Sequence, residues 1–166
     1  MNIKLIIMDV DGTLTDGSIY YDSNGIEIKA FTTRDGAILK PMNNLGIKVV
    51  FLTGRSSEAV TKRADDLEAI AIQGIDNKLL MLQELLANHK INNIEVAYIG
   101  DDLNDYTAMK ICGFKACPSD AVAEIKAICD YVSPFPGGHG AVRDVCECIL
   151  KKLGKYADFL AHYGVD

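Results

Sequence analysis

Short apolar runs alternate with helical stretches along most of the chain. The apolar runs cover residues 4–8, 47–52, 69–72, 96–99 and 114–117, and each has the length of a buried strand. Stretches with the spacing of amphipathic helices cover residues 56–67, 77–90, 103–112, 121–129 and 141–153. Strands that alternate with helices need crossover connections. The pattern therefore predicts an α/β fold, with one parallel sheet covered by helices on both faces.

Residues 18–31 break this alternation. Two arms rich in β-forming residues flank the turn-like sequence DSNG at residues 22–25, which predicts a β-hairpin inserted after the first strand, over about residues 17–32. Open α/β sheets bind ligands beside the carboxyl end of that strand, so the hairpin is either a lid or an edge decoration. Residues 154–166 are expected to form a short helix or a loose tail.

Composition and charge narrow the class of protein. At 166 residues the chain is expected to be a single domain spanning residues 1–166. The net charge is -6, and the 17 Lys and Arg residues are scattered, so nucleic acid is not an expected partner. No apolar run is long enough to span a bilayer, and no signal peptide follows Met1, so we expect a cytoplasmic protein without membrane contact. The five cysteines form no CxxC pair and are expected to be reduced thiols.

Polar residues collect where the predicted strands end or a helix begins. They are Asp9, Asp11, Thr53, Gly54, Arg55, Lys78, Asp101, Asp102 and Asp105. Because the carboxyl ends of parallel strands meet at one edge of a sheet, we expect these residues to converge there. Several carboxylates in one place repel one another unless a cation lies among them. With only oxygen ligands on offer, the pattern favours Mg²⁺ over zinc.

This set of residues predicts phosphoryl chemistry. Mg²⁺ held by few carboxylates commonly recruits an oxygen of a phosphorylated substrate. The Thr53 hydroxyl, the Gly54 amide and the Lys78 charge would bind the phosphoryl group. One aspartate can then act as a nucleophile and form an aspartyl-phosphate. A second carboxylate two positions along the strand faces the same side and can protonate the leaving group and later deprotonate water.

Each part also has a purely structural explanation. Two aspartates after a strand can be a cap or turn signal, and the sequence TGR at residues 53–55 can be a plain entry into a helix. A lone Lys78 can be a solvated surface residue. The occurrence of all these parts together, in this order, favours the chemical interpretation.

With these residues in place, the chain resembles the haloacid dehalogenase superfamily of phosphohydrolases. The resemblance rests on DVDGT at residues 9–13, on Thr53, on Lys78 and on GDD at residues 100–102 with Asp105. It implies a Rossmann-like fold in which Asp9 is the nucleophile, Asp11 is the acid/base, and Thr53 and Lys78 complete the catalytic set. It also implies that Asp9, the main-chain oxygen of Asp11 and Asp101 hold Mg²⁺.

A narrower similarity covers nearly the whole chain. The stretches DGSIYY, NGIEIKAFTTRDG, TGRSSEAVTKR, QGIDNK, YIGDDLND and GGHGAVRD are similar to the small cap-less phosphatases that release 3-deoxy-D-manno-octulosonate (KDO) from its 8-phosphate. That similarity implies a homotetramer in which the inserted hairpin helps to close the active site of a neighbouring subunit. The implied substrate is a small phosphorylated sugar acid. The family's substrate contacts carry over to Asp11, Thr32, Thr33, Arg34, Asp35, Gly36, Lys40, Gly54, Arg55, Arg63 and Lys78.

One departure from the family pattern concerns the helix expected after the hairpin. Pro41 lies inside this helix. Proline lacks an amide N–H and restricts the residue before it, so we expect the helix to start late or to kink. The position of Lys40 then depends on how the chain accommodates Pro41.

Three alternatives to the KDO 8-phosphate phosphatase remain open. Relatives that hydrolyse nine-carbon phosphates of the sialic acid type carry glutamate after Thr-Gly, whereas Arg55, together with Arg34, favours the eight-carbon substrate. A signalling receiver domain carries its phosphorylated aspartate at the end of the third strand, where this chain has Ile72-Gln73. A non-enzymatic regulatory or assembly domain of sugar-nucleotide synthesis would be degenerate, whereas every catalytic position is present here.

Overall fold

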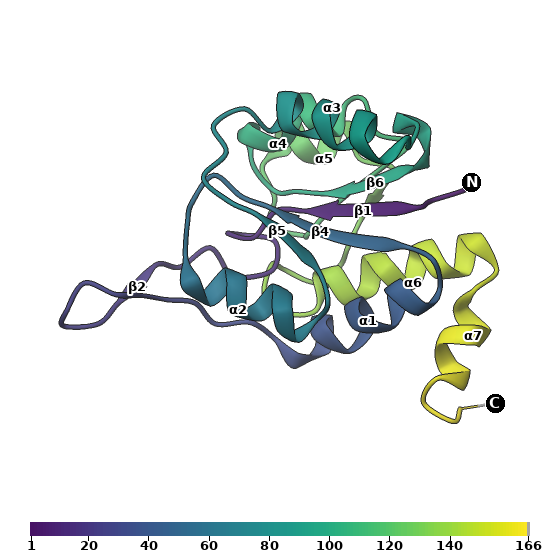
Figure 1. Ribbon diagram of the computed structural model, residues 1–166, viewed down its shortest axis with the longest axis horizontal. Helices are drawn as coiled ribbons and strands as arrows, with labels where there is room; N and C mark the ends of the chain where they lie inside the picture. Colours follow the sequence, from purple (N-terminus) through teal and green to yellow (C-terminus); the bar gives the residue numbers. More distant parts are fainter. Residues whose placement is uncertain (166) are drawn as a thin grey trace.

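The computed structural model describes residues 1–165 and contains the expected parallel sheet (Figure 1). Its strands in these residues are β1 (Leu5–Met8), β4 (Lys48–Leu52), β5 (Ile70–Ile72), β6 (Val96–Ile99), β7 (Phe114–Cys117) and β8 (Tyr131–Val132). They pair in the order β5-β4-β1-β6-β7-β8, and every pairing is parallel. All four residues of β1 are apolar and buried, so this strand suits the centre of a sheet covered on both faces. The predicted fold class is confirmed.

The register of the central strands brings their ends to one level. Met8, the last residue of β1, pairs with Phe51 on β4 and with Ile99 on β6. The residues that follow β1, β4 and β6 therefore meet at the same edge of the sheet. That edge is the one from which the inserted hairpin projects in Figure 1.

The predicted hairpin is present as a separate two-stranded sheet. β2 (Tyr20–Tyr21) pairs antiparallel with β3 (Glu27–Ile28). The Asp22 side chain closes the turn, because its Oδ1 accepts hydrogen bonds from the N–H groups of Asn24 at 2.9 Å and Ile26 at 2.8 Å. The hairpin thus forms through its own local contacts and extends away from the body of the molecule (Figure 1).

Helices cover both faces of the sheet. They are α1 (Thr33–Asn44), α2 (Glu58–Asp66), α3 (Lys78–His89), α4 (Leu103–Met109), α5 (Ala123–Ile128), α6 (Ala141–Leu153) and α7 (Tyr156–Ala161). Figure 1 shows α3, α4 and α5 on one face and α1, α2 and α6 on the other. The five helices predicted from apolar spacing, α2 to α6, are confirmed to within three residues at each end.

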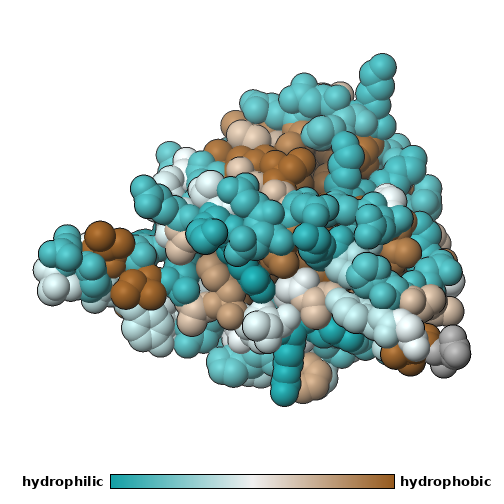
Figure 2. Space-filling model, turned by 60° about the horizontal axis from the view of Figure 1, so that its bottom comes forward, coloured by the Kyte–Doolittle hydropathy of each residue, from teal (hydrophilic) through white to brown (hydrophobic). Residues whose placement is uncertain are grey.

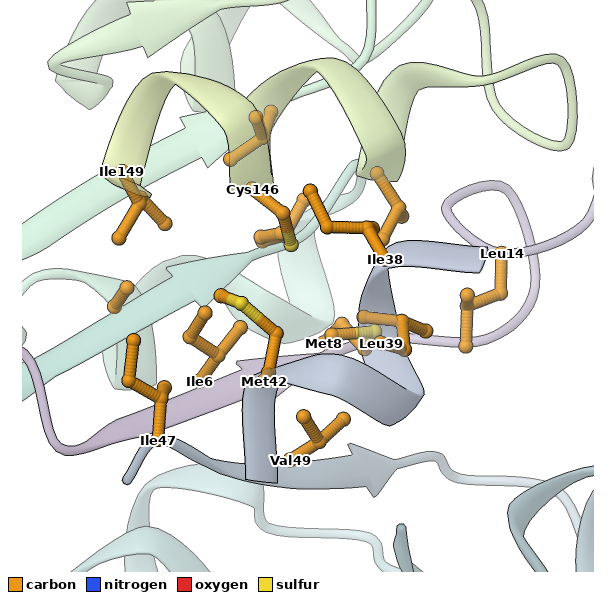
Figure 3. Close-up of a cluster of buried hydrophobic side chains, with 14 of the residues drawn as sticks. Ile6, Met8, Leu14, Ile38, Leu39, Met42, Ile47, Val49, Cys146 and Ile149 are labelled. Atoms are coloured by element: carbon orange, nitrogen blue, oxygen red, sulfur yellow. The ribbon is translucent and has the colours of Figure 1, made fainter. Parts of the chain in front are cut away.

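Two apolar clusters separate these layers. Figure 3 shows the cluster beneath α1 and α6, where Ile38 and Met42 of α1 and Cys146 of α6 face Ile6 and Met8 of β1. Alternate residues of β1, Leu5 and Ile7, belong to the second cluster beneath α3, α4 and α5. Because successive strand residues point to opposite faces, one short strand contributes to both clusters.

The structure corrects the expectation for the helix that contains Pro41. α1 begins at Thr33, so the predicted late start is wrong. Thr32 caps the helix through its side-chain oxygen, which accepts from the N–H of Arg34 at 3.3 Å. Pro41 has no N–H to donate to the carbonyl of Ala37. That carbonyl instead accepts a hydrogen bond from the Tyr163 hydroxyl at 2.6 Å, so the C-terminal segment satisfies the group that proline leaves unpaired.

The C-terminal segment is helical and packs on the body. The predicted tail contains α7, whose Phe159 is buried in the cluster beneath α1 and α6, while residue 166 lies outside the described residues. β8 is the strand that the apolar pattern missed, because it has two residues and Val132 is exposed. None of the helices in residues 1–165 is long and apolar enough to cross a membrane. The five cysteines are free thiols.

Candidate active site

The predicted nucleophile lies directly beyond the central strand. Asp9 follows β1, and its N–H donates to the carbonyl oxygen of Ile99 at 2.9 Å. Thr53 follows β4, and its N–H donates to the carbonyl oxygen of Ile72 at 3.0 Å. Both side chains are buried. Backbone hydrogen bonds that continue the sheet therefore hold the two loops that carry Asp9 and Thr53.

Lys78 lies between two aspartates. It is the first residue of α3, and its Nζ donates to Oδ1 of Asp9 at 2.6 Å and to Oδ1 of Asp105 at 2.7 Å. Its side chain is 1% exposed. Burial lowers the pKa of Lys78, but the charges of Asp9 and Asp105 outweigh burial, so the net pKa is raised. Lys78 is therefore held as a cation beside the predicted nucleophile.

Asp105 is a site residue to which the sequence assigned no role of its own. It is fully buried, and it accepts hydrogen bonds from the Tyr98 hydroxyl at 2.8 Å and from the N–H of Asp101 at 3.2 Å, in addition to the bond from Lys78. A Cβ on Gly100 would lie 2.6 Å from its carboxylate, so the turn needs glycine there. The available signal was its position in the first turn of a helix, because helical side chains lean back toward the preceding loop.

Three carboxylates crowd at this edge of the sheet. One oxygen from each of Asp9, Asp101 and Asp105 lies within 4.8 Å of the others. Burial, and then the charge of Asp105, raise the pKa of Asp9 well above its usual range, and Lys78 offsets this only in part. Burial also raises the pKa of Asp101 to about 6. These carboxylates lack sufficient counter-charge, and a cluster of carboxylate oxygens is a donor set that suits Mg²⁺.

Two glycine-containing loops pack around Asp101. The Thr13 hydroxyl donates to Oδ1 of Asp101 at 2.9 Å. Gly12 has a φ of 94°, and a Cβ there would lie 2.1 Å from Oδ2 of Asp101. A Cβ on Gly137 would lie 1.9 Å from the carbonyl oxygen of Gly12. Glycine is required at both positions, and the close approach of the loops fixes the Asp101 carboxylate.

A cavity of about 200 Å³ opens beside Asp9. Its lining residues are Asp9, Asp11, Thr53, Gly54, Arg55, Asp102 and Asn104. The cavity therefore brings the predicted nucleophile, the predicted acid/base and the predicted phosphate-binding Thr53 and Gly54 to one space. Lys78 does not line the cavity itself, but it donates a hydrogen bond to Asp9, which does.

The base of the hairpin is tied to this cavity. Arg55 forms an ion pair with Glu27, and its Nη2 donates to the Tyr21 hydroxyl at 3.2 Å. The hydrogen bond from Arg55 to Glu27 raises the pKa of Arg55 above its ordinary value, so the guanidinium stays charged. Lys29 forms ion pairs with Glu27 at 2.8 Å and with Asp11. Glu27 and Lys29 were not identified as site residues from the sequence, because both are polar residues in an arm of the predicted hairpin.

Some predicted substrate contacts lie where the hairpin joins α1, outside the 200 Å³ cavity. Thr32 caps α1, and Thr33 is its first residue. Arg63 of α2 donates to the carbonyl oxygen of Thr32 at 3.0 Å. A Cβ on Gly36 would lie 2.4 Å from Nη2 of Arg63, so glycine at this position makes room for the guanidinium. The binding roles of these residues stay predictions.

Other predicted contacts lie further along α1. Arg34 and Arg143 line a second cavity, of about 340 Å³. Asp35 is buried and accepts from the N–H of Arg143 at 2.8 Å, and burial raises its pKa to about 6. Lys40 pairs with Glu68 at 2.9 Å on the surface, where both side chains are more than half exposed. Within one chain, these residues do not line the cavity beside Asp9.

Comparisons with known proteins give the family of this chain. Residues 69–143 match the family described as haloacid dehalogenase-like hydrolase. The 3-deoxy-D-manno-octulosonate 8-phosphate phosphatases of Salmonella typhi and Escherichia coli (strain K12) are each 41% identical over 155 residues, which cover 93% of this chain and 82% of each relative. The phosphatase of that name from Moraxella catarrhalis, solved in complex with magnesium ion, phosphate ion and KDO, is 43% identical. It superposes with a TM-score of 0.93 over 97% of this chain and 93% of that chain.

Proposed function

The chain belongs to the 3-deoxy-D-manno-octulosonate 8-phosphate phosphatase family of haloacid dehalogenase-like hydrolases, and we propose that it hydrolyses KDO 8-phosphate with Mg²⁺ as its cofactor. The predicted family and enzyme class are thereby confirmed. One observation carries the proposal: Lys78 is buried between Asp9 and Asp105, and Asp9 shares a cavity with Asp11. A carboxylate nucleophile, a second carboxylate and a fixed cation can together hydrolyse a phosphate monoester through an aspartyl-phosphate.

The reaction proceeds in two halves. A carboxylate oxygen of Asp9 attacks phosphorus, and the bond between phosphorus and the ester oxygen of the sugar breaks. Asp11 gives its proton to that oxygen, so the sugar acid leaves as an alcohol. Asp11 then takes a proton from water, and the resulting hydroxide attacks the aspartyl-phosphate. Inorganic phosphate leaves, and the Asp9 carboxylate is restored.

Fixed charges and donors bind the phosphoryl group during both halves. Lys78 contributes a buried positive charge beside Asp9, and Asp105 holds the ammonium group of Lys78 in place. Thr53 and Gly54 line the same cavity, and their hydroxyl and amide groups can donate to phosphoryl oxygens. Asp9, Asp101 and the main-chain oxygen of Asp11 would hold Mg²⁺, which would supply further positive charge against the phosphate.

The choice between eight-carbon and nine-carbon substrates is assigned to Arg55. Arg55 lines the cavity, and its charged side chain is 42% exposed, so it can bind the carboxylate of the sugar acid. Turnover with Mg²⁺ should be measured on KDO 8-phosphate, on a nine-carbon sialic-acid-type 9-phosphate and on simple sugar phosphates. We expect preference for KDO 8-phosphate, and Arg55→Glu should weaken that preference. A flat profile in the wild type would indicate a general phosphatase instead.

We further propose that the protein is a homotetramer and that the hairpin contacts a neighbouring subunit. Apolar side chains gather on the projecting hairpin (Figure 2), and Ile19, Tyr20, Tyr21, Ile26 and Ile28 are each between 46% and 62% exposed. An exposed apolar projection of this kind is typical of an interaction site. Removal of residues 22–25 should lower both the molar mass by light scattering and the turnover. A fully active monomer without these residues would contradict this part of the proposal. The cytoplasmic location stays a prediction.

Asp9→Asn tests the mechanism most directly. The substitution removes the nucleophile and keeps the shape of the side chain, so we expect no phosphate release, with the fold and the oligomeric state preserved. EDTA should stop the wild-type enzyme, and added Mg²⁺ should restore it. Turnover by Asp9→Asn would rule out the mechanism. A wild-type chain without turnover would favour the regulatory domain, and stable phosphorylation without turnover would favour the receiver domain.

A further inference from the structure

The side chain of Lys29 is buried, and the mechanism above assigns it no role. It lies one residue beyond β3, on the arm of the hairpin that returns to the body. Its side chain is 1% exposed, although the backbone around it belongs to a projecting hairpin. Lysine is rarely buried to this extent without a partner of opposite charge. Lys29 has two such partners, because its Nζ contacts Oδ1 of Asp11 and lies 2.8 Å from Oε1 of Glu27.

These contacts belong to a chain of alternating charges. Arg55 pairs with Glu27, Glu27 pairs with Lys29, and Lys29 pairs with Asp11. This series of ion pairs runs from Arg55, which is proposed to bind the substrate carboxylate, to Asp11, the proposed acid/base. Glu27 and Asp11 are 13% and 20% exposed, so water screens these pairs less than it screens surface pairs.

The contact with Asp11 leaves one carboxylate oxygen for chemistry. Lys29 donates to Oδ1 of Asp11. Oδ2 then remains to carry the proton that the leaving oxygen takes. A carboxylate that is held through one oxygen has a restricted rotation, and proton transfer depends strongly on that orientation.

The pair is not needed to close the hairpin. The Asp22 turn and the pairing of β2 with β3 already join its two arms. The contact between Lys29 and Asp11 instead joins the hairpin to the loop after β1. We infer that Lys29 is a positioning residue, which orients the Asp11 carboxylate for proton transfer and couples its orientation to the hairpin. This inference rests on the proposed function, because it takes Asp11 as the acid/base.

Two substrates with different leaving groups distinguish a positioning role of Lys29 from a purely structural one. The alkoxide that departs from KDO 8-phosphate needs a proton, whereas the phenolate that departs from p-nitrophenyl phosphate does not. The value of kcat/KM reports only the steps up to departure of the leaving group. In Lys29→Met we expect kcat/KM to fall by about tenfold to a hundredfold on KDO 8-phosphate and by less than about threefold on p-nitrophenyl phosphate. On both esters kcat should fall, because Asp11 also activates water for release of phosphate.

Further variants separate positioning from folding. Lys29→Arg keeps the charge and should recover part of the loss on KDO 8-phosphate. Glu27→Gln leaves Lys29 beside Asp11 and should produce a smaller loss with the same preference between esters, so it tests the inference if Lys29→Met folds poorly. Lys115→Met is the control. It removes a partly buried lysine of β7 that pairs with Asp130 at 2.8 Å, and kcat/KM should stay unchanged on both esters.

The outcomes are distinct. Equal losses of kcat/KM on the two esters in Lys29→Met and Glu27→Gln would overturn the inference, because they would show a general loss of structure. Crystal structures would add a second readout, since the Asp11 carboxylate should change its rotamer in Lys29→Met. Failure of the wild-type enzyme to hydrolyse KDO 8-phosphate would instead overturn the proposed function.

Discussion

Replacement of Lys78 by methionine should destabilise the protein by about 3–5 kcal/mol at pH 7 in the absence of Mg²⁺. Methionine fills a similar volume, so the change removes a charge with little loss of packing. The ammonium group that bridges Asp9 and Asp105 disappears, and the two carboxylates remain buried. Activity should disappear as well, since the phosphoryl group loses its fixed cation.

The magnitude follows from the spacing of the charges. One carboxylate oxygen of Asp9 and one of Asp105 lie within 4.8 Å of each other. Two unit charges at that distance repel by about 3 kcal/mol at an effective dielectric constant of about 20. The lost attraction to Lys78 adds to this repulsion, whereas uptake of a proton by one carboxylate relieves part of it. The expected range therefore matches the usual cost of removing one partner from a buried ion pair.

Urea unfolding at a fixed protein concentration, in EDTA, provides the assay. For a chain of this size the loss corresponds to a melting temperature lower by about 6–20 °C. The loss should shrink as the pH falls, because the unpaired carboxylates bind protons more tightly in the folded state than in the unfolded state. Asp105→Asn in the Lys78→Met background should restore about 2 kcal/mol or more, since it removes one of the two unpaired charges. Lys115→Met is the control, and it should cost less than about 1 kcal/mol.

A loss below about 1 kcal/mol for Lys78→Met, or a loss that does not change with pH, would refute this reasoning. Either result would mean that the carboxylates are hydrated or already protonated in the wild-type protein. The double variant Lys78→Met/Asp105→Asn tests whether a loss of stability comes from charge repulsion or from poor packing of methionine. Packing defects would remain after Asp105→Asn, whereas charge repulsion would not.

Two further predictions concern stability. Burial raises the pKa of Asp35 to about 6, so the folded protein binds the Asp35 proton more tightly and loses stability as the pH rises from about 4 to about 6. Asp35→Asn keeps an acceptor for the N–H of Arg143 and should stabilise the protein by up to about 3 kcal/mol at pH 8 and by nothing at pH 4, as urea unfolding would show. Tyr163→Phe should cost about 1 kcal/mol, because the Ala37 carbonyl loses its donor. In a Pro41→Ala background the cost should fall, since the new N–H can donate to that carbonyl, and equal costs in both backgrounds would contradict the account.

Most strands and helices, and the convergence of Asp9, Thr53 and Lys78 at one edge of the sheet, were predictable from the sequence alone. β1 was predictable because a short apolar run of strand length is typical of a strand buried on both faces of a sheet. The bounds of α6 were predictable from the helical spacing of apolar residues over 141–153, and in the structure Gly140 and Gly154 flank the helix with φ values of 103° and 70°. Asp9 and Thr53 were predictable as neighbours because parallel strands bring their carboxyl ends to one edge. Each of these inferences needs only local periodicity and the geometry of a parallel sheet.

The partners of individual polar residues could be identified only from the tertiary structure. The pairing of Lys78 with Asp105 joins residues 27 positions apart, and the hydrogen bond from Tyr163 to Ala37 joins residues 126 positions apart. Nothing in the apolar spacing around Lys29 distinguishes a buried partner of the acid/base from a solvated side chain on a hairpin. Burial and pairing of a charge depend on how distant loops approach in three dimensions. The local sequence can specify the residue, but only the fold supplies its partner.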